Sequence, residues 1–154
     1  MMRRVFLLFS HHLTPAQEKE LADEWHAPVM RLMPEALKKR WGNVPPESPS
    51  VREWVQPVLD WVAGEAAPGD VILVQGDYGA TVLAVSWALS KGLVPVYATT
   101  ERLLEETVQP DGSVVQKRVF RHVRFRRYEF CPPSNGIEKV GCPGGTADAM
   151  GGQS

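Results

Sequence analysis

Apolar residues along the chain gather in short continuous runs that are separated by segments with a helical period. The runs at 4–9 and 71–75 have the length of strands and hold no alternating polar positions, which is typical of strands covered on both faces. Shorter runs at 29–33 and 94–98 predict two further strands. The segments between them predict helices at 15–25, 34–41 and 50–67, and an apolar helix that ends near Lys91.

Residues with known preferences for helix ends mark several of these boundaries. Thr14, Pro15 and Gln17 fit an N-cap, a first helical position and the third residue of a capping box. Ser50 and Glu53 have the same spacing and predict a second capping box. Pro57 predicts a kink in the helix that follows, and Gly92 predicts the C′ position that ends the apolar helix.

The order of these elements predicts the fold class. Strands that alternate with helices favour an α/β fold with a Rossmann-like, mostly parallel sheet and flanking helices. After a loop at 99–102, the segments 103–109 and 114–128 predict a C-terminal β-hairpin around the turn at 110–113. We therefore expect one domain at 1–130, followed by a disordered Gly/Pro-rich tail at 131–154.

Composition narrows the class of protein. The chain has 154 residues, of which 44% are hydrophobic and 23% charged, and its net charge is -1, as in an ordinary soluble globular domain. Its apolar runs are far shorter than the ~20 residues of a membrane span, and the N-terminus lacks the pattern of a secretory signal. We expect a cytoplasmic protein. Cys131 and Cys142 lack zinc-ligand spacing and predict neither a metal site nor a disulfide framework.

The small net charge hides a basic strip on the second hairpin strand. Six cations and no acid occur between Lys117 and Arg127, whereas the rest of the chain has 11 basic and 18 acidic residues. Such a strip favours a local anionic partner. The alternative is a solvated edge strand that is protected by its charge.

Ligands of open α/β sheets bind at the carboxyl ends of the strands, so the loops that follow the strands are candidate sites. They are Ser10–His12, Gln75–Thr81 and Thr99–Arg102. Gly76 and Gly79 permit close backbone approach to a ligand, and the next helix directs its positive N-terminus toward the same loop. The spacing is neither GxGxxG nor a P-loop, which disfavours an ordinary dinucleotide or ATP site.

Each of these residues also has a purely structural interpretation. The two glycines serve a tight turn equally well, and Asp77 can cap the helix. His11 and His12 can be exposed loop residues, and Arg102 can pair with Glu105 or Glu106. The functional hypothesis depends on the coincidence of polar loops at one edge of the sheet.

Five segments together resemble the CRISPR-associated accessory family called Csx-twenty, over about residues 3–128. They are VFLLFSHHLTP from Val5, WGNVPP from Trp41, VQGDYGAT from Val74, VYATTER from Val96 and VFRHVRFR from Val119. The resemblance implies a CARF-like domain of type III CRISPR defence, and within that class a ring nuclease. Such proteins bind a cyclic oligoadenylate messenger, most often cyclic tetra-adenylate, and open it to switch off antiviral signalling.

The resemblance and the loop positions together give the expected site. Metal-independent attack by a ribose 2′-OH leaves a 2′,3′-cyclic phosphate and requires that the attacking group be held in line and that charge on phosphorus be stabilised. We expect no cofactor and no metal. The expected catalytic residues are Ser10, His11, Thr100 and Arg102. The expected ligand-binding residues are His12, Gln75, Gly76, Asp77, Tyr78, Gly79, Ala80, Thr81, Thr99, Glu101, Arg124 and Arg126.

The expected partners are the cyclic ligand and a second copy of the chain, with no membrane and no stable DNA binding. A two-fold symmetric ring of phosphates suits a homodimer that presents each loop twice. Two alternatives remain: a sensor or sponge that binds the ring without cleaving it, and an RNA-binding accessory protein that uses the aromatic and basic side chains of the hairpin.

Overall fold

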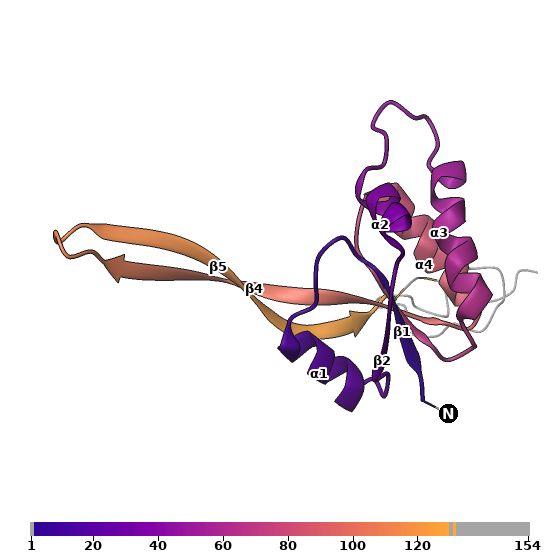
Figure 1. Ribbon diagram of the computed structural model, residues 1–154, viewed down its shortest axis with the longest axis horizontal. Coiled ribbons are helices and arrows are strands. Elements are labelled where there is room, and N and C mark those ends of the chain that lie inside the picture. Colours follow the sequence, from indigo (N-terminus) through magenta and orange to yellow (C-terminus); the bar gives the residue numbers. More distant parts are fainter. Residues whose placement is uncertain (1, 130, 132–154) are drawn as a thin grey trace, which may run out of the picture.

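The structure is a computed structural model that describes residues 2–129 and 131. Five strands form one sheet in the order β2-β1-β3-β4-β5 (Figure 1). The strands are β1 (Arg4–Leu8), β2 (Val29–Leu32), β3 (Val71–Val74), β4 (Val94–Val108) and β5 (Val114–Arg127). The pairs β1–β2, β1–β3 and β3–β4 are parallel, and β4–β5 is antiparallel. The expected mixed α/β class is therefore confirmed.

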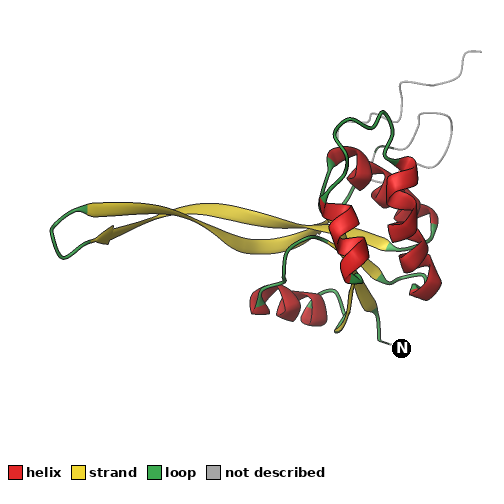
Figure 2. Ribbon diagram, turned by 45° about the horizontal axis from the view of Figure 1, so that its top comes forward, coloured by secondary structure: helices red, strands yellow, loops and turns green. Residues whose placement is uncertain are grey.

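Helices cover both faces of the sheet at the end of the molecule that holds the short strands (Figure 2). They are α1 (Pro15–Asp23), α2 (Glu35–Gly42), α3 (Arg52–Glu65) and α4 (Tyr78–Ser90). Val5 and Leu7 of β1 pack with Leu21 of α1. Phe6 and Leu8 point to the other face, where they join a cluster with residues of α2, α3 and α4. This alternation explains why β1 reads as a continuous apolar run.

Two of the predicted helix signals are confirmed and one is wrong. The Thr14 hydroxyl accepts from the Gln17 backbone N–H at 3.2 Å, and the Gln17 side chain accepts from the Thr14 N–H at 2.9 Å, which completes the capping box. Gly92 has φ +74° just after α4. Ser50 and Glu53 form no capping box, because α3 begins at Arg52 and Glu53 therefore occupies the second helical position.

Helix α3 continues through Pro57 over its full 14 residues. Proline cannot donate to the carbonyl oxygen of Glu53, four residues earlier. A guanidinium N–H of Arg40 reaches that oxygen at 3.5 Å, and Arg40 Nε donates to the Trp54 carbonyl oxygen at 2.5 Å. The side chain of α2 thus supplies donors at the point where the α3 ladder lacks one.

The largest departure from the sequence prediction concerns β4. No loop occurs at 99–102, because β4 continues without a break for 15 residues and pairs with β5 as far as Val108. The two strands leave the body together and project far beyond the helices (Figure 1). We call their projecting part, residues 101–121, the arm.

A β-bulge lies at the root of the arm. Thr99 is opposite Arg124 and Thr100 is opposite His122, which makes Val123 an extra residue. The bulge places His122 and Phe125 on one face, with their rings 4.8 Å apart. Phe125 is fully buried against α1. The predicted tail at 131–154 lies outside the described residues apart from Cys131. Cys131 is disulfide-bonded, although the spacing of the cysteines predicts no disulfide framework.

Candidate functional site

The order of the strands reverses between β1 and β3, so the loops that follow these two strands flank one point at the carboxyl edge of the sheet. Ser10, His11 and His12 follow β1 and are exposed. Gln75, Gly76 and Asp77 follow β3 and lead into α4. The structure therefore brings together two of the three loops that the sequence indicates.

Gln75 holds three strands together. Its backbone N–H donates to the Leu8 carbonyl oxygen at 3.0 Å, and its side-chain Oε1 accepts from the Ala98 N–H at 2.9 Å. These bonds extend the pairing of β3 toward β1 on one side and toward β4 on the other. The described contacts of Gln75 are thus structural, and they leave its ligand-binding role an expectation.

The space beside Gly76 is occupied by a tryptophan from α2. A Cβ atom at Gly76 would lie 2.8 Å from Trp41 Nε1 and 2.9 Å from Cε2. Trp41 itself is 2% exposed, and its indole N–H donates to the Gln75 carbonyl oxygen at 2.9 Å. Glycine is required here by the packing of Trp41, a reason different from both sequence interpretations of Gly76, which were close approach to a ligand and a tight turn.

The protein itself supplies an acceptor for one of the free backbone N–H groups in the first turn of α4. Asp77 is the N-cap, and its carboxylate accepts from the Ala80 N–H at 3.0 Å. Ala80 is buried, whereas the Tyr78 ring is 91% exposed. The Thr81 hydroxyl is buried and has no hydrogen-bond partner among the described residues. The Asp77 carboxylate therefore occupies the N-terminal end of α4, where an anionic ligand would otherwise bind.

His11 lies on the β2 side of the switch point. Its ring packs edge-on to Phe9 at 5.3 Å between centroids. Lys38 of α2 lines the same small gap. Ser10 lies against Gly42 at the end of α2. Both residues therefore lie beside α2.

A second group of side chains lies on the neighbouring strands, at the root of the arm. Tyr97 is opposite Arg126 and Thr99 is opposite Arg124, so these four residues share one face of the sheet. The Arg126 guanidinium lies 5.2 Å from the centre of the Tyr97 ring. No carboxylate among the described residues pairs with Arg124 or Arg126. This face thus presents exposed cations beside an aromatic ring.

Two bonds fix that face to the sheet. The Thr99 hydroxyl donates to the Arg124 carbonyl oxygen at 2.9 Å and lies 3.2 Å from the Arg124 N–H. The Tyr128 hydroxyl donates to the Val74 carbonyl oxygen at 2.5 Å, and its ring lies 4.7 Å from that of Tyr97. Burial raises the pKa of the Tyr128 phenol, and the nearby Tyr97 adds to the rise.

The remaining predicted residues lie away from both groups. Thr100 and Arg102 are on the α1 face of β4, and the Arg102 guanidinium lies 5.5 Å from the Phe120 ring centre. Glu101 forms an ion pair with Arg121. The structure does not bring Thr100 and Arg102 to Ser10 and His11 within one chain, since β4 carries them beyond the edge of the sheet.

Sequence reasoning missed a buried polar cluster under α1. The Glu20 carboxylate accepts from His122 Nε2 at 2.7 Å, the Phe125 N–H at 2.7 Å and the Trp25 indole at 3.1 Å. The side chains of His122 and Glu20 are only 8% and 10% exposed. A histidine and a phenylalanine interrupting a run of arginines gave the one available signal that this stretch of β5 is not wholly solvated.

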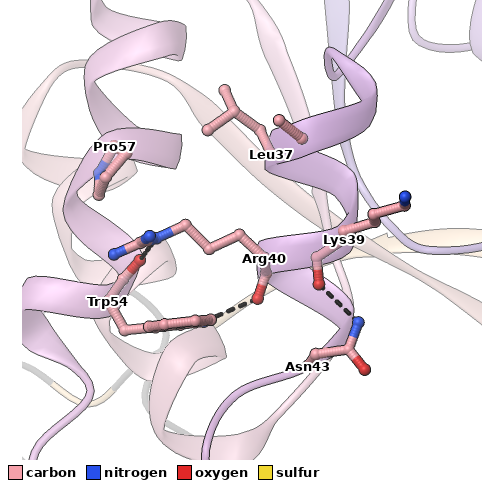
Figure 3. A pocket seen from close by; sticks show the side chains of 7 residues that line it. Leu37, Lys39, Arg40, Asn43, Trp54 and Pro57 are labelled. Carbon is pink, nitrogen blue, oxygen red and sulfur yellow. Dashed lines mark hydrogen bonds between the residues drawn. The ribbon is translucent and has the colours of Figure 1, made fainter.

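A cavity of about 440 Å³ lies between α2 and α3 (Figure 3). Arg40 and Trp54 both line it, and the Arg40 guanidinium lies 4.1 Å from the centre of the Trp54 indole ring. Trp54 Nε1 donates to the Arg40 carbonyl oxygen at 2.7 Å, and Arg40 donates to carbonyl oxygens of α3. Because these donors are already used, we assign the pair to the contact between the helices.

Among the described residues, no cluster of three potential metal ligands occurs. In the same part of the chain, every helix is too short or too polar to cross a membrane.

Comparison with known proteins identifies a family, and the names of the matches state no activity. The sequence profile described as the Uncharacterized protein MJ1673 family matches residues 3–126. "Uncharacterized protein MJ1673" of Methanocaldococcus jannaschii is 35% identical over 127 residues, which cover 82% of this chain and 98% of that protein. No solved structure matches. The matched residues include both strands of the arm.

Proposed function

The chain belongs to the MJ1673 family, and for this member we propose a cytoplasmic ring nuclease of type III CRISPR defence. It binds a cyclic oligoadenylate, with cyclic tetra-adenylate as the preferred ring, and opens it without a metal. The five-stranded body would then be a CARF-like member of the Rossmann-like folds. The resemblance of the five segments described above supports this class of ligand, and the geometry supports the place where it binds.

One observation carries the proposal. The exposed Ser10–His12 loop and the start of α4 flank the switch point. On the adjoining strands, Arg124 and Arg126 lie beside Tyr97 with no carboxylate partner among the described residues. Phosphate oxygens suit the guanidinium groups, and an adenine suits an aromatic face. The polar loops and the basic, aromatic surface together match a nucleotide that has several phosphates and bases.

In this proposal the substrate supplies the nucleophile. The 2′ oxygen of one ribose loses its proton and forms a bond to the adjacent phosphorus, while the bond from phosphorus to the 5′ oxygen breaks. The 5′ oxygen takes up a proton, which leaves a 2′,3′-cyclic phosphate and a 5′-OH. His11 moves a proton, and Ser10 and the arginines hold phosphate oxygens.

A homodimer is part of the proposal. Within one chain, Thr100 and Arg102 lie on the α1 face of the sheet, whereas Arg124 and Arg126 lie on the other face. A second copy offers another set of each loop around a two-fold axis, which matches the symmetry of a cyclic tetranucleotide. In this proposal Thr100 and Arg102 therefore contribute to catalysis only on a ring that two copies of the chain share.

A non-cleaving sponge is the second candidate, and two observations favour it. Asp77 occupies the anion-binding end of α4, and Trp41 fills the space beside Gly76. The first takes up a backbone N–H at the end of the helix, and the second removes the free space on one side of Gly76. Binding of the ring without turnover would identify the sponge.

The test compares ligands on the purified chain. We expect cyclic tetra-adenylate to bind more tightly than linear tetra-adenylate or a single-stranded RNA of mixed sequence, and to be converted to linear product. Equal binding of all three, with a steep dependence on salt, would contradict a ring-specific site and support general RNA binding.

A further inference from the structure

We propose that the arm is a dimerisation arm, which packs on the exposed apolar face of α4 in a second copy of this chain. The inference rests on the homodimer of the proposed function but is independent of ring cleavage. It assigns an occupant to the arm and to the outer face of α4, whose first residue, Tyr78, is also an expected ligand-binding residue.

The arm has no core of its own. Its Leu104, Val108 and Phe120 side chains are 58%, 71% and 61% exposed, and Val114 and Val115 beside the turn are about half exposed. A two-stranded hairpin that is packed on neither face is marginal in water. Leu104, Val108, Val114 and Phe120 share one face of the arm and Val115 lies on the other, and such exposed apolar side chains indicate that another surface covers the arm.

The charge of the arm favours a protein surface over a nucleic acid. Residues 101–121 contain four acidic side chains and four basic ones, so the arm is formally neutral. The acidic members are Glu101, Glu105, Glu106 and Asp111, and the basic members are Arg102, Lys117, Arg118 and Arg121. The other cations of the basic strip lie nearer the body, and a neutral arm offers little attraction to a polyanion.

The surface of α4 has the matching chemistry. None of its 13 residues is charged, and Ala80, Ala84 and Ala88 face the core. Outward, Tyr78 and Val82 are 91% and 64% exposed and one turn apart. They border a hollow of about 550 Å³ between α4 and the segment 48–52. Ser86 and Ser90 continue the same exposed stripe toward the end of the helix, so the apolar part of the outer face is its N-terminal half.

The arm cannot reach α4 of its own chain, because the paired strands run straight away from the helices (Figures 1 and 2). From Glu101 to Val108 it extends about 25 Å, which exceeds the ~20 Å length of the 13-residue helix α4. A two-fold axis repeats the contact and closes the assembly, since each copy gives one arm and receives one. The family match includes the arm as well as α4.

Sedimentation of the full chain tests this inference without any ligand. We expect a dimer. Val108→Glu in the arm and Val82→Glu on α4 should each raise the dimer dissociation constant more than roughly tenfold. Leu32→Glu on the edge strand β2 is the matched control, because Leu32 is 62% exposed and also apolar. It should leave the dimer unchanged.

Both substitutions lie at exposed positions, and circular dichroism of each variant checks that it is folded. Mixing chains that carry Val82→Glu with chains that carry Val108→Lys should restore heterodimers, because one of the two arm contacts is then unsubstituted and the other joins surfaces of opposite added charge. A monomeric wild-type chain would overturn the inference, as would a dimer that survives both substitutions or that Leu32→Glu dissolves. Loss of ring cleavage in a dimer that remains intact would instead count against the proposed function alone.

Discussion

The indole N–H of Trp41 donates to the carbonyl oxygen of Gln75 at 2.9 Å, which fixes α2 on the loop that follows β3. The same ring lies where a side chain at the next residue would project. The loop at the switch point is therefore held rigidly by the protein before any ligand arrives, and preorganised sites bind at lower entropic cost.

Gly76→Ala should lower the free energy of unfolding by about 1–3 kcal/mol, because the new Cβ overlaps a buried ring that has little room to shift. Chemical denaturation measures the change. Gly64→Ala is the control, since no atom lies within 4 Å of its Cβ position in α3, and alanine there should stabilise by roughly 0.5–1 kcal/mol. Equal effects at both positions would contradict the packing described for Trp41.

Glu20→Ala should destabilise the protein by about 2–4 kcal/mol, because it leaves buried donors from His122, Phe125 and Trp25 without their acceptor. Glu24→Ala, at an exposed position just after α1, should change stability by less than about 0.5 kcal/mol. If the two variants melt alike, the cluster under α1 does not hold β5 to the body.

The sequence predicted the parts of the fold that depend on local patterns. Thr14 and Gly92 sit at helix ends whose backbone geometry these residue types favour, and the buried strands follow from uninterrupted apolar runs. The prediction of a loop at 99–102 was wrong, because these residues belong to β4. A strand with both faces in solvent does not require alternating apolar and polar residues, so its sequence resembles that of a loop. The basic strip likewise did not indicate the bulge at Val123, and the only signal of burial within it was that His122 and Phe125 interrupt the arginines.

The candidate site was predicted only as far as topology determines it. Parallel strands and their order bring the loops after β1 and β3 to one edge, which the alternation of elements implies. Trp41 and Gly76 are far apart in the sequence, so their contact could not be predicted from a local pattern. Gly76 is required by that contact, whereas its place in the loop suggested a ligand or a tight turn. Asp77 had both interpretations, and its bond to the Ala80 N–H supports the structural one.

Arg124→Ala and Arg126→Ala should each weaken ring binding and reduce its dependence on salt by roughly one counterion for every phosphate that the variant no longer neutralises. Titrations at several salt concentrations give the slope. Lys91→Ala is the control, because Lys91 is exposed and follows the C-terminal end of α4, at the other end of that helix from the switch point. An unchanged slope in the first two variants would indicate that these cations only protect an edge strand.

His11→Ala should lower turnover about 10²–10⁴-fold with little change in binding, because an imidazole that moves a proton acts mainly in the transition state. His12→Ala tests the adjacent exposed histidine and should have a smaller effect. Single-turnover kinetics with saturating protein separate the two steps. A small loss of rate with equally weakened binding would show that His11 positions the ring.

The most direct measurement incubates the purified chain with labelled cyclic tetra-adenylate in EDTA and resolves the products by chromatography. The proposal predicts linear products with a 2′,3′-cyclic phosphate and a 5′-OH. It also predicts that a ring whose attacking 2′-OH is removed binds but stays intact. Cleavage that depends wholly on added Mg²⁺ or Mn²⁺, or products that end in a 3′-OH, would contradict the 2′-OH mechanism.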